Sequence, residues 1–171
     1  MEKEVKKSSQ QQIIDKVEKS ATSIDEMIDS IIAPYCLELD EYIDFVKDII
    51  TDSENPPTDI ELEDMSMNLA TLIYYASVGC EQMGIRDDIS KSIYKEAYNN
   101  ARNLLTTGTV ADKNAQAEID SREEQVVNII YNKSFKILKA KVETAQELLG
   151  SVKKSLTRRV AELETTRMGR N

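Results

Sequence analysis

The sequence contains no histidine, only two cysteines, and few glycines and prolines, five and three in 171 residues. Without histidine, neither a Ser-His-Asp triad nor a Cys-His nucleophilic pair can form, and two cysteines are too few for a cysteine-rich zinc site. The five glycines are isolated from one another, so the chain has no glycine-rich phosphate loop. We therefore expect a protein that is not an enzyme, with no catalytic residues, no metal and no cofactor.

Long apolar runs are also missing. No window approaches 18 consecutive apolar residues, so we expect no membrane-spanning helix and no membrane partner. The polar start "MEKEVKKSSQQQ" lacks the apolar centre of a secretion signal, which favours a cytoplasmic protein, in the host cell if the protein is viral. In that compartment Cys36 and Cys80 are expected to be buried thiols, with a disulfide between them as the alternative.

Apolar residues recur at spacings of three and four along most of the chain, which is the pattern of amphipathic helices. The scarcity of glycine and proline argues against the many turns of a sheet protein. The predicted fold class is all-α, a helical bundle with a long C-terminal amphipathic or coiled-coil helix. We expect one domain with three regions: an acidic N-terminal helical region (1–53), central helices (58–108) and a long basic C-terminal helix (109–171).

Proline and capping residues predict the boundaries in the first half. An apolar stripe that includes Ile13, Val17 and Ile28 predicts the first helix, which Pro34 is expected to break or restart. The segment "DSENPPTD" is the clearest loop, because its two prolines cannot continue a helix. Thr58 and Glu61 have the spacing of a capping box, so a helix should begin directly after the loop.

Glycines predict the boundaries in the second half. We expect the central helix to fray near Gly84, and an aspartate at 87 or 88 to cap the next helix, which ends at Gly108 in a left-handed conformation after its last turn. The last element, from about Val110 to Thr165, contains no proline and one glycine. A straight helix through Gly150 and a bend at that residue are both compatible with the sequence.

The last element carries an apolar repeat close to a heptad pattern over nearly four heptads. Its residues are Leu138, Val142, Ala145, Leu149, Val152, Leu156, Val160 and Leu163. Such a seam packs against another helix, in the same chain or in another subunit, and it contains no asparagine that would fix the number of subunits.

Charge is sorted along the chain, although the formal net charge is only −9. Residues 24–64 contain fourteen acidic residues and a single base, Lys47, whereas residues 131–171 contain ten bases and four acids. The acidic run is interpreted as a solvated face, as a docking surface for a basic partner, or as a mimic of nucleic acid. The basic segment "KKSLTRR" is interpreted as the solvated flank of a coiled coil, as a contact for phosphates, or as a contact for the acidic half of the protein.

Three features together resemble a known family. They are the segment "YKEAYNNARNLLTTGTVADKNAQAEIDS", a tyrosine in the final helix (Tyr131), and the late segment "ELLGSVKKSLTRRVAEL". This arrangement is similar to the UvsY-type recombination mediators of T-even bacteriophages and their distant relatives, over roughly residues 89–163.

The resemblance implies a homo-oligomer that binds single-stranded DNA and helps a RecA-like recombinase replace the single-strand-binding protein. The implied oligomerisation residues belong to the apolar seam, namely Leu149, Val152, Leu156, Val160 and Leu163. The implied phosphate contacts are Lys133, Lys136, Lys139, Lys153, Lys154, Arg158 and Arg159. The acidic region would then dock the recombinase, keep DNA off the other faces, or neutralise the basic helix of a neighbouring subunit.

Two other functions remain as alternatives. The first is a helical scaffold or adaptor that assembles through its C-terminal coiled coil without nucleic acid. The second is an acidic inhibitor that mimics DNA, which the basic C-terminal segment disfavours.

Overall fold

The computed structural model describes residues 9–168, which form four α-helices and no strand. The helices are α1 (Ser9–Thr51), α2 (Asp59–Leu104), α3 (Val110–Asp120) and α4 (Arg122–Met168). The predicted all-α fold with a long C-terminal helix is confirmed. The polar stretch before Ser9, and Arg170 among the C-terminal bases, lie outside the described residues.

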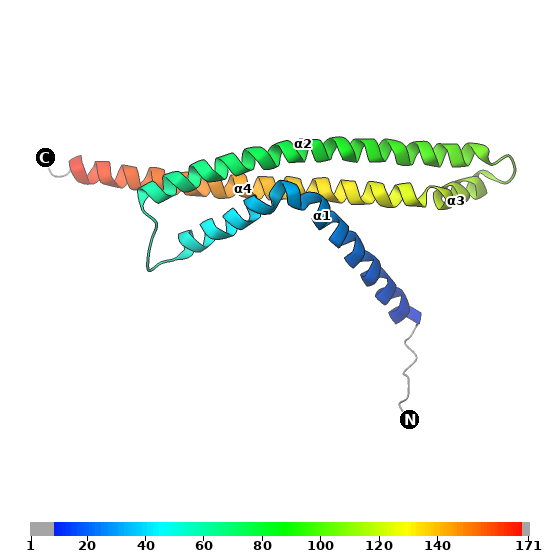
Figure 1. The fold of residues 1–171 in the computed structure, drawn as a ribbon, viewed down its shortest axis with the longest axis horizontal. Helices are drawn as coiled ribbons and strands as arrows, with labels where there is room; N and C mark the ends of the chain where they lie inside the picture. The colour runs from blue at the N-terminus through cyan, green and yellow to red at the C-terminus, as the bar shows by residue number, and fades with distance from the viewer. Residues whose placement is uncertain (1–8, 169–171) are drawn as a thin grey trace, which may run out of the picture.

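Helices α2 and α4 run antiparallel along most of their length, and α3 makes the return between them (Figure 1). The last turns of α4 extend beyond the start of α2, and the C-terminal half of α1 lies against the pair (Figure 1). None of the helices in residues 9–168 is long and apolar enough to cross a membrane.

Side-chain caps set the two helix starts that follow loops. Thr58 is the N-cap of α2: its hydroxyl accepts from the backbone N–H of Glu61, whose carboxylate accepts from the backbone N–H of Thr58 at 2.6 Å. The predicted capping box is confirmed, and Thr109 with Asp112 forms a second one at the start of α3. Gly108 has φ of 100°, as predicted, but it precedes this second cap, because α2 already ends at Leu104.

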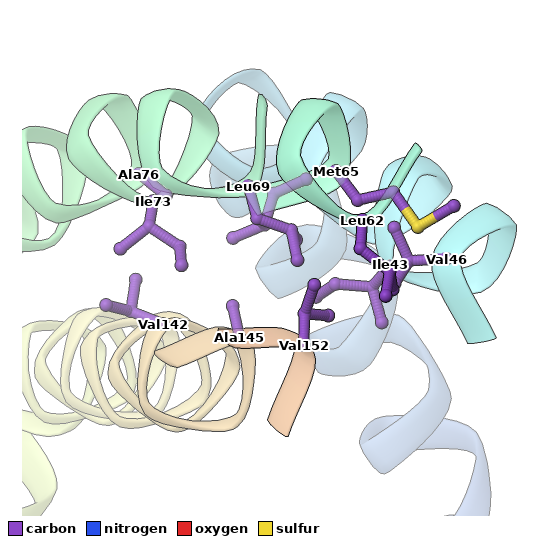
Figure 2. Close-up of a cluster of buried hydrophobic side chains, with 11 residues drawn as sticks. Ile43, Val46, Leu62, Met65, Leu69, Ile73, Ala76, Val142, Ala145 and Val152 are labelled. Carbon is purple, nitrogen blue, oxygen red and sulfur yellow. The ribbon is translucent and has the colours of Figure 1, made fainter. Parts of the chain in front are cut away.

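The core consists of two clusters along the helix pair. In the first cluster, Leu69 and Ile73 of α2 face Val142, Ala145 and Val152 of α4 (Figure 2). The C-terminal half of α1 adds its own apolar side chains to this cluster, among them Leu39, Ile43 and Val46. The second cluster contains Ile28, Ile32, Cys36, Cys80, Met83, Ile130 and Leu138.

Two predicted boundaries differ from the structure. Helix α2 continues through Gly84, because a single glycine costs a helix only about 1 kcal/mol and the Phe135 side chain packs against this glycine. Instead, the last element divides at Ser121, where φ is −103° and ψ is 17°, and the buried Ser121 hydroxyl donates to the carbonyl of Ala117. Helix α4 then runs without interruption through Gly150.

Helix α1 bends at mid-length and diverges from the pair toward its N-terminus, although Ile28 and Ile32 still pack in the second cluster (Figure 1). Pro34 lies inside α1 and has no N–H to donate to the preceding turn, which accounts for a bend rather than a break. Tyr35 fixes the bend, because its ring lies on Gly79 of α2 and its hydroxyl accepts from Arg86 at 2.7 Å. The apolar stripe near the N-terminal end of α1 stays uncovered, because Ile13 and Val17 are 61 % and 59 % exposed.

Candidate nucleic-acid interface

The candidate phosphate contacts lie on α4, and all except Arg159 are exposed. Lys136 and Lys154 are 18 residues apart, which is about five turns, so they leave the helix in the same direction. By the same geometry Lys133, Lys139 and Arg158 lie within about 60° of that direction, and Lys153 about 100° away. One face of α4 therefore gathers five of the seven predicted bases.

This basic face is divided into two clusters. Glu143 and Glu147 lie on the same side of α4, between the bases at 133–139 and those at 153–158. Lys139 forms an ion pair with Glu143 at 3.9 Å, and Arg158 forms one with Glu162 at 2.9 Å. These pairs are solvent-exposed, so they hold their cations weakly and an approaching phosphate can replace the carboxylate.

The remaining exposed lysines carry uncompensated charge. Within residues 9–168, Lys133, Lys136, Lys153 and Lys154 form no ion pair with an acidic side chain. Their ammonium groups are solvated and accessible, which suits non-specific contact with a polyanion.

Arg159 differs from its neighbour Arg158, because it turns toward its own chain. Its guanidinium donates to the carbonyl oxygen of Pro57 and lies 3.5 Å from a carboxylate oxygen of Asp59. Arg159 thus ties α4 to the α1–α2 loop. A phosphate contact by Arg159 stays a prediction, and it requires these internal contacts to open.

A second internal pair joins the basic and acidic regions. Lys141 of α4 donates to Asp40 of α1 at 2.6 Å, and both side chains are about one-third exposed. Burial alone lowers the pKa of Lys141, but the hydrogen bond and the negative charge of Asp40 outweigh it and raise the pKa above its usual value. The acidic half therefore contacts the basic helix in two places, and most of the predicted bases point elsewhere.

The apolar seam of α4 serves mainly as intrachain core. Val152 is fully buried between the helices, and Leu149 and Leu156 pack against the same cluster. Val160 and Leu163, in the last turns of α4, are 46 % and 55 % exposed. Oligomerisation through this seam stays a prediction, and Val160 and Leu163 are the most exposed of its residues in the monomer.

The acidic residues gather at the other side of the fold, on the C-terminal half of α1, the following loop and the first turns of α2. Asp52 organises the loop by accepting from the backbone N–H groups of Glu54 and Asn55. These hydrogen bonds, the one from Glu54 first, lower the pKa of Asp52. The other acidic side chains of this surface are largely exposed; they are Glu38, Glu41, Asp44, Asp48, Glu54, Glu61, Glu63 and Asp64.

The thiols and acidic side chains of residues 9–168 form neither a metal-ligand cluster nor an exposed thiol site. No group of three or more His, Cys, Asp or Glu side chains in residues 9–168 is arranged to hold a metal ion. Cys36 and Cys80 are both free and buried. Burial, and next the charge of Asp40, raise the pKa of the Cys36 thiol to about 11, so this thiol is protonated and unreactive at neutral pH.

Sequence reasoning missed one surface. The exposed apolar side chains Ile89 and Ile93 of α2 and Val127 of α4 line a hollow of about 450 Å³ beside the point where α1 departs. Helical periodicity predicts that such residues belong to a core. The sequence signal for their exposure is Pro34, where α1 bends away from the helix pair.

No protein-family model, curated protein or solved structure matches this chain.

Proposed function

We propose that the protein is a non-enzymatic recombination accessory protein that binds single-stranded DNA through the outer face of α4 and assists the loading of a RecA-like recombinase. The observation that carries the DNA contact is the set of exposed, unpaired lysines of α4, with those at 133, 136 and 154 on that face and Lys153 beside it. The assignment to recombination rests on the resemblance to UvsY-type mediators.

The chemistry of the face favours binding without sequence recognition. Lysines on a helix neutralise phosphates and release counterions, which gives affinity that falls steeply with salt. The aromatic residues of α4, Tyr131 and Phe135, pack against the second core cluster and offer no stacking platform for bases. The acidic surface on α1 and α2 repels DNA and suits a basic surface on a protein partner, the role that the resemblance gives to the recombinase.

The binding experiment uses fluorescence anisotropy of a labelled oligo-dT strand of about 30 nucleotides at several salt concentrations. If the six outward bases each contact a phosphate, the slope of log K against log salt is about −4, from about −0.7 for each contact. The double variant K136E/K154E should lower the affinity at least about ten-fold and flatten that slope.

A charge-matched control separates the α4 face from net charge. K91E/K95E makes the same change in net charge on exposed positions of α2, so it should leave most of the affinity intact. Equal losses in both variants would show that net charge, not this face, governs binding. Absence of binding by the unmodified protein at low salt would contradict the DNA proposal.

The scaffold or adaptor function is the second candidate, and a separate observation favours it. The apolar stripe on the N-terminal half of α1 is solvent-exposed, which is typical of a helix that docks on another protein. An adaptor of this kind would bind its partner equally well with K136E/K154E.

A further inference from the structure

The chain has two uncovered apolar faces that belong to one interrupted interface. The first face is the stripe of α1 before its bend, formed by Ile13, Ile14, Val17 and the half-buried Ile24. It continues directly into Ile28, which is 3 % exposed in the core. The stripe therefore has the spacing and direction of a core face but lacks the helices that should cover it.

The second face is the groove between α2 and α4 beyond the point where α1 departs. Its floor is apolar, from Ile89, Ile93 and Val127, and Arg86 and Glu124 lie at its edges. Ile89 and Ile93 are 53 % and 52 % exposed. The groove thus presents hydrophobic surface between α2 and α4, on the side from which α1 diverges (Figure 1).

The groove is the continuation of the surface that α1 already covers. Gly79, Arg86 and Ile93 are spaced by seven residues, about two turns, so they face the same side of α2. Gly79 and Arg86 both contact Tyr35 of α1, whereas Ile93 is about half exposed, at 52 %. A helix that docks on Ile93 would extend the packing that the C-terminal half of α1 makes with the pair.

The bend prevents the chain from covering its own groove. Straightening α1 would have to move the Tyr35 ring off Gly79 and break its hydrogen bond with Arg86. Pro34 also opposes straightening, because a proline inside a helix lacks one backbone hydrogen bond and its ring clashes with the preceding turn. The two faces therefore remain apart within one copy.

We propose that a second copy of this chain covers the groove: the N-terminal half of α1 from each copy docks between α2 and α4 of the other. The stripe and the groove are both apolar and exposed, so each supplies the surface that would cover the other. The two faces are self-complementary on one chain, as a two-fold symmetric dimer requires. The interface is separate from the basic face of α4, so this inference goes beyond DNA binding and does not depend on it.

The test measures solution mass by light scattering and analytical ultracentrifugation on the full chain, from about 1 to about 200 μM. The unmodified protein should reach twice the monomer mass of 19.4 kDa. I14D/V17D on the stripe and I89D/I93D in the groove should each weaken dimerisation at least about 100-fold, since each charge enters a buried apolar contact. Lys19→Glu, on the opposite side of α1, makes the same change in charge as the stripe variant and should dimerise normally.

Mixing the two variants gives the decisive observation. The stripe variant has an intact groove and the groove variant has an intact stripe, so a one-to-one mixture should form a heterodimer through one docked helix. Both variants fold alone if their helical circular dichroism matches that of the unmodified protein, because the changed side chains are exposed in the monomer. Oligo-dT anisotropy on the same samples reports DNA binding independently of mass.

Three results would overturn the proposal. A mass of 19.4 kDa at the highest concentration shows that α1 closes on its own groove or stays free. Dimers of I89D/I93D with monomers of I14D/V17D show stripe-to-stripe pairing between copies of α1. Failure of the mixed variants to associate shows that the two faces do not meet.

Discussion

Replacing Gly79 with alanine tests whether the bend of α1 is held by close packing. A Cβ atom at this position would overlap Cδ1 of Tyr35 and lie 2.7 and 2.8 Å from its Cγ and Cβ atoms. Real Cβ atoms do not approach other atoms so closely, so something must move. The Tyr35 Cβ is attached directly to the backbone of α1, so a rotation of the ring does not relieve the contact.

Two opposing effects decide the sign. Alanine favours a helix over glycine by about 1 kcal/mol, which stabilises the variant. Overpacking of a close helix contact costs about 1–3 kcal/mol, and the upper end applies here because α1 itself must shift. We expect G79A to destabilise the protein by about 1–2 kcal/mol, which lowers Tm by about 3–6 °C for a chain of this size.

Two other helical glycines provide the controls. A Cβ on Gly150 meets nothing within 4 Å, so G150A should show the helix effect alone and raise Tm by about 3 °C. A Cβ on Gly84 meets the outer edge of the Phe135 ring at 3.3 Å, which yields by a small rotation, so G84A should lie between the other two.

Thermal unfolding followed by circular dichroism measures all three variants. In a Tyr35→Gly background all three clashing atoms are absent, so G79A should regain the stabilisation seen for G150A, and this double-mutant cycle isolates the contact. If G79A alone is stabilised as much as G150A, then Tyr35 does not lie on Gly79 and the proposed fixing of the bend is refuted.

Three further predictions follow from individual contacts. Thr58→Ala removes the cap of α2 and should lower the free energy of unfolding by about 1 kcal/mol. Hydrogen bonds from Thr58 depress the pKa of Glu61 below its usual value of 4.5. The stability difference between the two proteins should therefore be full above about pH 4.5 and shrink as the pH falls through the depressed pKa. Alkylation of Cys36 at pH 8 should be far slower in the folded than in the urea-unfolded protein, since its folded pKa is about 11; equal rates would contradict its burial. Arg159→Met should lower stability by about 1 kcal/mol through its lost contacts to Pro57 and Asp59, whereas Arg158→Met should leave Tm unchanged, because Arg158 is 81 % exposed.

Local signals in the sequence predicted the parts of the fold that local interactions decide. The start of α2 at Thr58 and the left-handed Gly108 depend on a few neighbouring residues, so their residue types suffice. The break at Ser121 also had a local signal, since Ser121 and Glu124 have capping-box spacing before an apolar run. The absence of glycine and proline near residue 121 favoured a single long helix instead. In the structure the Ser121 hydroxyl donates to Ala117, and Oε2 of Glu124 has no partner among residues 9–168.

The remaining features depend on residues far apart in sequence. Gly79 and Gly84 lie inside α2, and the side chains of Tyr35 and Phe135 pack against them. The sequence alone does not distinguish a glycine that permits such packing from a glycine that ends a helix. The periodic stripe of Ile13 and Val17 is that of a buried helix, yet its exposure follows from the bend near Pro34. Periodicity gives the face of a helix, but only the tertiary arrangement determines what covers it.

The same distinction explains why the basic segment of an acidic protein is not neutralised by its own acids. Helix α4 uses its apolar seam to pack on α2 and α1, and this packing fixes which of its bases turn inward. Lys141 and Arg159, at the edge of the seam, reach Asp40 and Asp59, and the bases on the opposite side cannot reach any acid of α1. Packing therefore leaves opposite charges on two separate surfaces of one chain, so each surface suits a different partner: a polyanion on α4 and a basic protein on α1.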